Sequence, residues 1–248
     1  MRYEESIIEG RNSVTEAFRS GKTIDRLFIL DGCQDGPIKT ILREAKGTDC
    51  IISFVKKERL DQMSETGKHQ GVIAYAAAYE YAEVDDILKA AEKKGEDPFI
   101  IILDGIEDPH NLGAMIRTAD QVGAHGIIIS KRRAVGLTAT VAKTSAGAIN
   151  YVPVAKVTNI SQTIAELKRK TNIWFAAADM SGGPMQNCNL KGPIGLVIGS
   201  EGEGVSRLVK EACDFTVSIP MKGNIDSLNA SVAMAVLSYE VFRQRNYL

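Results

Sequence analysis

The sequence predicts an α/β protein in which a carboxy-terminal parallel sheet flanked by helices follows a small amino-terminal α/β domain. Short apolar runs alternate with segments of helical periodicity, which is typical of strands joined by crossover helices. The carboxy-terminal runs are almost wholly apolar, as expected of parallel strands covered on both faces. A chain of 248 residues is also long enough for two modest domains, each with its own core.

Residues 1–78 are expected to form the small domain. Ser13 and Glu16 have the spacing of a capping box, and apolar residues at helical spacing follow them. The remaining elements are three strands and a second helix, expected at 26–30, 50–55, 71–78 and 38–45. The charged stretch 79–97, which includes a Lys-Lys-Gly-Glu-Asp-Pro loop and room for one short helix, is interpreted as a linker.

Residues 98–248 are expected to form the larger domain. Its five predicted strands are 99–103, 126–129, 173–177, 195–198 and 215–219. Helices are expected near 113–121, 138–146, 160–168 and 205–212, and a final helix over 227–245.

The composition excludes several classes of protein. With a net charge of -1 and a pI of about 6.3, the chain exerts no general attraction on nucleic acid, so an RNA partner must be held by local patches. Apolar runs are too short to cross a bilayer, and the first residues lack the pattern of a signal peptide, so a cytoplasmic protein without a membrane partner is expected. Four scattered cysteines and three histidines predict reduced thiols and no metal site.

The first loop with chemical character is 104–117 (DGIEDPHNLGAMIR), which leaves a strand and enters a helix. Parallel sheets commonly place ligands at such exits. Asn111 lies near the expected helix start, and Arg117 follows about two turns later. Two interpretations stay open here: Asn111 caps the helix while Arg117 faces solvent, or both belong to a site.

The second loop, 198–204 (IGSEGEG), has glycines that allow tight turns and a close approach of backbone to a ligand. Its spacing matches neither the Rossmann fingerprint nor the P-loop, and Glu201 would repel phosphate. The third loop, 219–231, ends a strand at Pro220 and offers Asp226 or Ser227 as a helix cap. Capping alone does not explain why Ser227, Asn229 and Ser231 crowd the same turn.

Taken together and in this order, the three loops resemble the three motifs of the SpoU/TrmH family of RNA ribose 2′-O-methyltransferases, within the SPOUT superfamily. The resemblance covers residues 98–248, and residues 137–147 add to it. Residues 8–16 and 69–72 resemble the small substrate-binding domain that some members carry. This pair of domains is most similar to the RlmB-type members, which methylate a guanosine ribose of 23S ribosomal RNA.

The resemblance implies a fold and a cofactor that periodicity does not reveal. It implies that the carboxy-terminal segment threads through a loop to give a trefoil knot, and that the protein is a homodimer with its active site completed at the subunit interface. It also implies that S-adenosyl-L-methionine is bound at four positions: Gly199, Ile219, Ser227 and Leu228.

The catalytic cluster implied by the resemblance is Asn111, Arg117, Glu201 and Asn229. In the family this arginine is proposed to activate the 2′-hydroxyl, but a guanidinium keeps its proton in proteins, so a clamp on RNA is the role we expect. RNA contacts are expected from Arg11, Asn12, Arg132 and Arg133. The last two lie in a Lys-Arg-Arg sequence that departs from the arginine-serine-alanine expected there. A solvated basic turn is the alternative for that segment.

Two other functions compete with the methyltransferase hypothesis. A nucleotide-binding oxidoreductase would suit the α/β pattern, but its glycine spacing and acidic residue are not found. A non-catalytic RNA-binding protein on the same fold would not need all the polar motif residues. Ribosomal RNA is the favoured substrate, with transfer RNA as the alternative.

Overall fold

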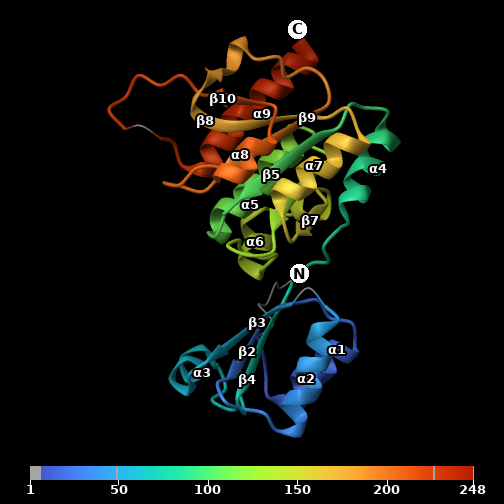
Figure 1. Ribbon diagram of the computed structural model, residues 1–248, viewed down its shortest axis with the longest axis vertical. Helices are drawn as coiled ribbons and strands as arrows, with labels where there is room; N and C mark the ends of the chain where they lie inside the picture. The colour runs from blue at the N-terminus through green and yellow to red at the C-terminus, as the bar shows by residue number, and fades with distance from the viewer. Residues whose placement is uncertain (1–6, 49, 226, 248) are drawn as a thin grey trace. The chain divides into compact units, whose positions relative to one another are not determined.

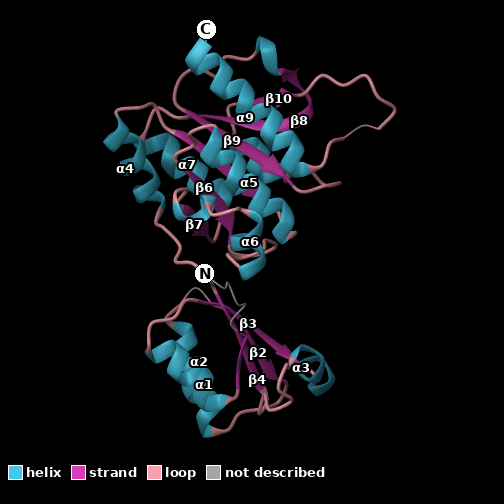
Figure 2. Cartoon of the chain, turned by 180° about the vertical axis from the view of Figure 1, so that it is seen from behind, coloured by secondary structure: helices cyan, strands magenta, loops and turns pink. Residues whose placement is uncertain are grey.

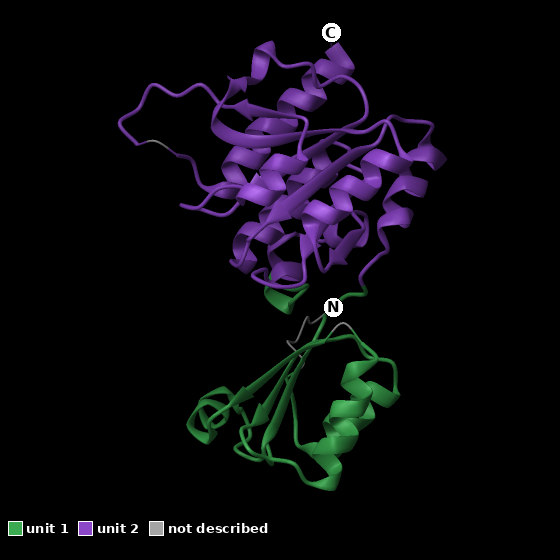
Figure 3. Ribbon diagram, viewed as in Figure 1, with its two compact units in different colours: residues 1–80, 136–140 green, residues 81–135, 141–248 purple. Residues whose placement is uncertain are grey.

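The computed structural model describes residues 7–48, 50–225 and 227–247, and the chain divides into two compact units. Unit 1 comprises Met1–Glu80 with Gly136–Thr140, and unit 2 comprises Tyr81–Val135 with Val141–Leu248 (Figure 3). Each unit contains its own sheet and its own apolar core.

Unit 1 is built on a mixed sheet of four strands in the order β1-β4-β2-β3. Only β2 and β3 run parallel, while β4 is antiparallel to both of its neighbours. The strands are β1 (Ile7–Glu9), β2 (Ile24–Leu30), β3 (Ile51–Val55) and β4 (Val72–Ala76). Helices α1 (Arg11–Arg19) and α2 (Gly36–Lys46) lie on one side of this sheet and α3 (Lys57–Met63) on the other (Figures 1 and 2). Apolar side chains of α1 and α2 pack with those of β2 and β4 to form the core.

The start of α1 differs from the capping box predicted at Ser13. The helix begins two residues earlier, at Arg11, because Gly10 turns the chain with a φ of 87° and serves as the cap residue without a side-chain hydrogen bond. That left-handed backbone favours glycine and allows β1 to pass directly into the helix. β1 and α3 are additional elements that the sequence patterns did not indicate.

Unit 2 is built on a six-stranded sheet in the order β10-β8-β9-β5-β6-β7, and every neighbouring pair is parallel. The all-parallel sheet expected from the apolar strands is therefore confirmed. Its strands are β5 (Phe99–Asp104), β6 (Gly126–Ser130), β7 (Val154–Val157), β8 (Trp174–Pro184), β9 (Ile194–Gly199) and β10 (Phe215–Ser218). β7 was not predicted, because it has only four residues and one of them is a lysine, so the apolar run is too short to indicate a strand.

Helices cover both faces of this sheet (Figures 1 and 2). One face carries α4 (Val84–Lys94), α7 (Ile160–Lys170) and α8 (Arg207–Ala212), whose apolar residues share one core cluster with the strands. The other carries α5 (Pro109–Gln121), α6 (Ala139–Thr144) and α9 (Ala230–Tyr247). Two short 3-10 helices, η1 (Ala148–Asn150) and η2 (Met185–Asn187), complete the unit.

The segment 79–97, expected to be a linker, belongs largely to unit 2. Ala82 forms a β-bridge with Ala155, and α4 buries Ile87 and Ala91 completely. Ile87 packs so closely on Gly126 that a Cβ there would lie 2.5 Å from its side chain. The charged residues of this helix face solvent, which is why its composition resembled that of a linker.

None of the helices in the described parts of the chain combines the length and apolar character needed to span a membrane.

Candidate active site

The three predicted loops all leave carboxyl ends of strands in the parallel sheet. The first follows β5 and the second follows β9, and these strands are neighbours, with Asp104 paired to Gly199 at their ends. The third follows β10 and leads into α9, which packs against α5 and β9. Carboxyl ends of parallel strands share one edge of the sheet, so the fold gathers loops that lie far apart in the sequence.

In the first loop, the cap of α5 is Asp108 rather than Asn111. The Asp108 carboxylate accepts a hydrogen bond from the backbone N–H of His110 at 2.9 Å, and Pro109 occupies the first helical turn. Asn111 therefore has no capping role, and its Nδ2 donates to Oε1 of Glu201 at 2.9 Å. The capping interpretation of Asn111 is therefore wrong, and its side chain faces Glu201 instead.

The second loop depends on glycine for a steric reason. A Cβ on Gly199 would lie 1.9 Å from the carbonyl carbon of Gly204, because the loop doubles back on itself. Gly202 and Gly204 have positive φ values of 87° and 68°. Oδ2 of Asp104 then accepts the backbone N–H of Ser206 at 2.8 Å, which fastens the loop to β5. These restraints place Glu201 toward α5 and α9.

In the third loop, Asn229 caps α9, and the cap predicted at Ser227 is wrong. Oδ1 of Asn229 accepts the backbone N–H groups of Ser231 at 3.0 Å and Val232 at 3.3 Å. Asp226, the other residue proposed as a cap, lies outside the described residues. The Nδ2 group of Asn229 faces the site and donates to Oδ1 of Asn111 at 3.0 Å and to Oε1 of Glu201.

Asn111, Glu201 and Asn229 thus form one hydrogen-bonded cluster, which we call the amide–carboxylate cluster. Both amides donate to Oε1 of Glu201, while Oε2 accepts no hydrogen bond from any described residue. Arg117 is not brought into this cluster. It is exposed on α5 and has no hydrogen bond or ion pair with the described residues.

A cavity of about 440 Å³ adjoins the cluster and is lined by all four predicted cofactor residues, Gly199, Ile219, Ser227 and Leu228. Its wall also includes three residues in the middle of β8 that sequence reasoning missed: Ala178, Asp179 and Met180. Lys210 and Ser181 donate hydrogen bonds to Asp179 and lower its pKa to about 2, so the carboxylate is ionised. The signal that could have found Asp179 is its place as the first charged residue after the apolar run that predicted this strand.

A second cavity, of about 460 Å³, lies beside the first and shares Ser200, Glu201, Glu203, Gly204 and Ala230 with it. Its lining is strongly acidic and includes Asp104, Glu107, Asp108, Glu201 and Glu203. Arg133, held at a positive φ of 52°, is the basic residue among the lining side chains. No group of three or more histidine, cysteine, aspartate or glutamate side chains in the described part of the chain is arranged to hold a metal ion.

The other residues predicted to contact RNA differ in whether their side chains are already paired within the protein. Arg11 is engaged within unit 1: its guanidinium forms an ion pair with Asp35 at 2.6 Å, and its Nε donates to the carbonyl of Gln70 at 3.1 Å. Asn12 and Arg132 are exposed. Of the predicted RNA-binding residues, Arg133 is the one that lines a cavity together with Asn111 and Glu201.

An all-parallel α/β sheet that ends in a ligand-sized cavity, a glycine-dependent loop and a fixed polar cluster defines an enzyme of the α/β class that binds a small organic cofactor. Residues 98–239 match the model of the SpoU rRNA Methylase family, and residues 7–82 match the RNA 2′-O ribose methyltransferase substrate-binding domain. The chain therefore belongs to the SpoU rRNA methylase family.

Proteins of similar sequence align with nearly the whole length of this chain. YacO of Bacillus subtilis (strain 168), assigned to the TrmH family of tRNA/rRNA methyltransferases, is 51% identical over 99% of this chain and 98% of its own length. A TrmH-family relative from Staphylococcus saprophyticus is 48% identical with the same coverage. Among solved structures, the SpoU methyltransferase AviRb from Streptomyces viridochromogenes in complex with AdoMet has a TM-score of 0.62 at 25% identity, covering 97% of this chain and 90% of that one.

Proposed function

We propose that this protein transfers a methyl group from S-adenosyl-L-methionine to a ribose 2′-hydroxyl of RNA, and that its target is a guanosine of 23S ribosomal RNA. The observation that carries the proposal is the amide–carboxylate cluster at the wall shared by two cavities. One cavity suits the methyl donor and the other suits the target nucleotide. The cluster lies where the methyl group must cross between them.

The first cavity fits S-adenosyl-L-methionine. Its volume is in the range of small-molecule sites, and it combines backbone atoms at Gly199 and Ile219 with apolar side chains. Met180 and Leu228 line it and are 66% and 39% exposed, so apolar surface is available to cover an adenine ring. When bound, the cofactor supplies a methyl group on a positively charged sulfonium. The residues of the chain hold it, orient it and exclude water.

The second cavity and its surroundings suit an RNA segment held by a few directed contacts. Its acidic lining would repel a phosphate, except near Arg133, which has no hydrogen bond or ion pair with any described residue. Arg132 is exposed in the same turn, and Arg117 is exposed on α5. We infer that these arginines clamp RNA phosphates around the target ribose, and that Asn12 of the small domain adds a contact. Arg11, already paired with Asp35, acts on RNA by holding the start of α1 in place.

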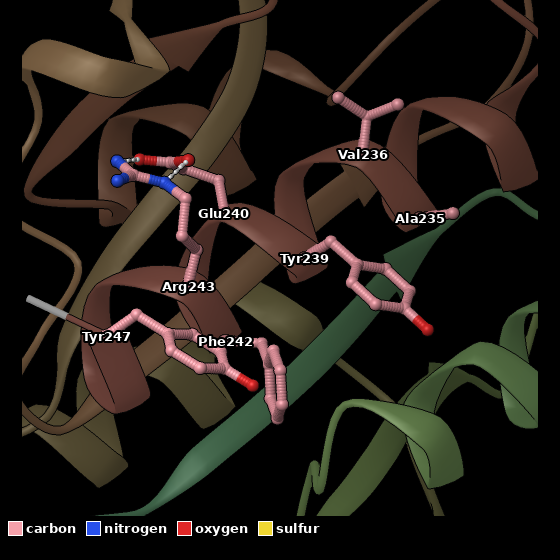
Figure 4. Close-up of a pocket in the computed structure, with 7 residues that line it drawn as sticks. All are labelled: Ala235, Val236, Tyr239, Glu240, Phe242, Arg243 and Tyr247. Carbon is pink, nitrogen blue, oxygen red and sulfur yellow. Dashed lines mark hydrogen bonds and ion pairs between the residues drawn. The ribbon is translucent and has the colours of Figure 1, made fainter.

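The functional unit that we propose is a homodimer formed through α9. The outward face of this helix carries a row of aromatic and apolar side chains around a shallow cavity of about 630 Å³ (Figure 4). Tyr239 is 50% exposed and Tyr247 is 72% exposed, and Phe242 lies between them in edge-to-face contact with both. A second copy of the chain would cover this face, and α5, which bears Arg117, packs directly beside it.

The test is to incubate the protein with labelled S-adenosyl-L-methionine and either unmodified 23S ribosomal RNA or a pool of unmodified transfer RNA. We expect label in a single alkali-resistant linkage of the ribosomal RNA, because a 2′-O-methyl group blocks cleavage at that nucleotide. Methylation of the transfer RNA alone would identify transfer RNA, and not ribosomal RNA, as the substrate. Failure to bind the cofactor at all would contradict the enzyme proposal and favour an RNA-binding protein.

Two substitutions of Arg117, to alanine and to lysine, test the proposed role of its side chain in holding RNA. Arg117→Ala should lower methyl transfer by roughly 100-fold or more if the guanidinium orients the RNA. Arg117→Lys keeps the charge but loses the planar fork, so it should recover only part of that loss. Near-normal transfer by the lysine variant would show that charge alone is required.

A further inference from the structure

The second cavity offers a bound nucleotide more hydrogen-bond acceptors than donors. Five carboxylates line it, and Arg133 is the basic side chain among the lining residues. An ionised carboxylate accepts hydrogen bonds and cannot donate them. In the proposed function the ribose 2′-hydroxyl lies at the wall shared with the cofactor cavity, so the attached base occupies the rest of the second cavity. A base that presents donors is therefore the one that suits this lining.

The four RNA bases differ in the donors on their base-pairing edge, which is the edge that an enzyme reads once a base has left the stack. Guanine presents two adjacent donors there, N1–H and the N2 amino group. Adenine and cytosine each present one amino group beside a ring nitrogen that accepts, and uracil presents one N–H between two carbonyl oxygens. The two oxygens of a carboxylate match the guanine edge, whereas each other base sets an acceptor against one of them.

Glu107 is the carboxylate available to read that edge. Asp104 and Asp108 each accept a backbone N–H, at the starts of α8 and α5. Glu201 belongs to the amide–carboxylate cluster, and Glu203 lines the cofactor cavity as well. Glu107 lines only the second of these two cavities and has no hydrogen bond or ion pair with any described residue. Both of its oxygens can therefore accept from a base.

The backbone that carries Glu107 is held in place although the side chain is exposed. Ile106, the preceding residue, is 4% exposed, and its carbonyl accepts the backbone N–H of Val135 at 2.9 Å. This contact joins the first loop to the segment that carries Arg133, and both side chains line the same cavity. A nucleotide bound there would meet Glu107 at its base and Arg133 at its phosphate.

Building on the proposed function, we propose that Glu107 is the residue that selects guanosine at the target position. Its carboxylate accepts hydrogen bonds from N1–H and from the N2 amino group of guanine, while the ribose 2′-hydroxyl of the same nucleotide lies at the shared wall. Adenosine at that position would set the lone pair of its N1 against the carboxylate. Glu107 takes no part in methyl transfer itself and decides which nucleotide is presented to the cofactor.

The test compares two RNA substrates on two proteins. A fragment of the RNA that the wild type modifies, spanning the modified nucleotide, is synthesised with either guanosine or inosine at that position. Inosine differs from guanosine only in lacking the N2 amino group. For the wild type, kcat/KM for the guanosine fragment should exceed that for the inosine fragment by about 10-fold or more, the usual effect of losing one hydrogen bond to a charged group. In Glu107→Ala the ratio should fall to within about twofold of unity.

This ratio separates base recognition from a structural role, because a change in folding or in cofactor binding affects both RNAs alike. Glu92→Ala is the matched control, since Glu92 is exposed on α4 and lines neither site cavity. It should keep the wild-type ratio. Competition between the two fragments for binding gives the same comparison without turnover, so a variant too slow to assay still decides the question.

The contrary outcomes are distinct. Equal methylation of both fragments by the wild type, an unchanged ratio in Glu107→Ala, or an equal loss in Glu92→Ala would each overturn the role of Glu107 and leave the proposed methyl transfer standing. A modified nucleotide other than guanosine would do the same. A wild-type protein that binds cofactor and methylates none of the RNAs would refute the proposed function, and this inference with it.

Discussion

At the scale of single residues, Asn229 serves the helix and the site at the same time. Its Oδ1 caps α9, and this contact forces Nδ2 to face Asn111 and Glu201. The cap thus decides the orientation of the amide, which a side chain free to rotate would not maintain. Helix stability and site geometry are coupled through one residue.

Asn229→Asp tests this coupling. Aspartate caps a helix as well as asparagine does, so the free energy of unfolding should change by less than about 1 kcal/mol. The substitution removes both donated hydrogen bonds and places a second negative charge beside Glu201. Methyl transfer should fall by roughly 10- to 100-fold, the equivalent of losing about 1.5–3 kcal/mol from hydrogen bonds to a charged group.

Thermal unfolding and single-turnover methyl transfer would be measured on the same preparations. Asn159→Asp, at the cap of α7, is the control: aspartate keeps the side-chain oxygen that accepts the backbone N–H of Gln162, so neither quantity should change appreciably. Unchanged transfer in Asn229→Asp would show that the amide donors are dispensable.

At the scale of elements, α9 carries more than one task. Its inward face buries Met234, Leu237 and Val241, while Gln244 and Arg245 fasten its last turn. Gln244 accepts the backbone N–H of Leu190, and Arg245 donates to the carbonyls of residues 97, 98 and 192. The helix is thus anchored at both ends, by the Asn229 cap and by this set of contacts, and its outward aromatic face is presented on a rigid support.

The substitution Tyr239→Glu tests whether the outward face of α9 forms a dimer interface. A charge in the middle of the outward face should weaken self-association by about 30-fold or more if that face is the core of a dimer interface. Sedimentation velocity over a range of protein concentrations would measure it, with Lys93→Glu on the exposed side of α4 as a charge-changing control. A wild-type protein that sediments as a monomer, or a Tyr239→Glu variant that remains dimeric, would contradict the proposed interface.

At the scale of the whole molecule, the chain contains two separate cores. The core of unit 1 is formed by α1, α2 and their sheet, and that of unit 2 by helices on the parallel sheet. All residues that line the two site cavities belong to unit 2. Cofactor binding should therefore stabilise one unit only.

Scanning calorimetry should show two unfolding transitions, and S-adenosyl-L-methionine should raise the midpoint of one of them. Leu27→Ala, which truncates a fully buried side chain of unit 1, should lower the other transition through a loss of about 2–5 kcal/mol. A single transition that responds to both the ligand and the substitution would show that the two units unfold together.

Much of the fold followed from local pattern. Apolar runs identified β5, β6, β8, β9 and β10, because a parallel strand buried on both faces must be apolar throughout. Elements whose character depends on their neighbours were missed or misplaced. β7 is too short to give a pattern, and the short helix expected within 79–97 is α4, which belongs to unit 2 although its charged segment was interpreted as a linker. The threading of the carboxy-terminal segment, implied by family resemblance, stays a prediction.

The sequence by itself determined the chemical inventory of the site: Asn111, Glu201 and Asn229 lie in three loops expected at strand ends, and the resemblance of these loops to a known family singled them out. Tertiary structure decided which of their atoms meet, because hydrogen bonds over separations of 90 and 118 residues depend on strand order. It also decided that Arg133 lines the cavity beside Glu201 while Arg11 is paired with Asp35. Local sequence fixes backbone preference and side-chain chemistry, whereas the direction in which a polar group points is set by the packing of distant elements.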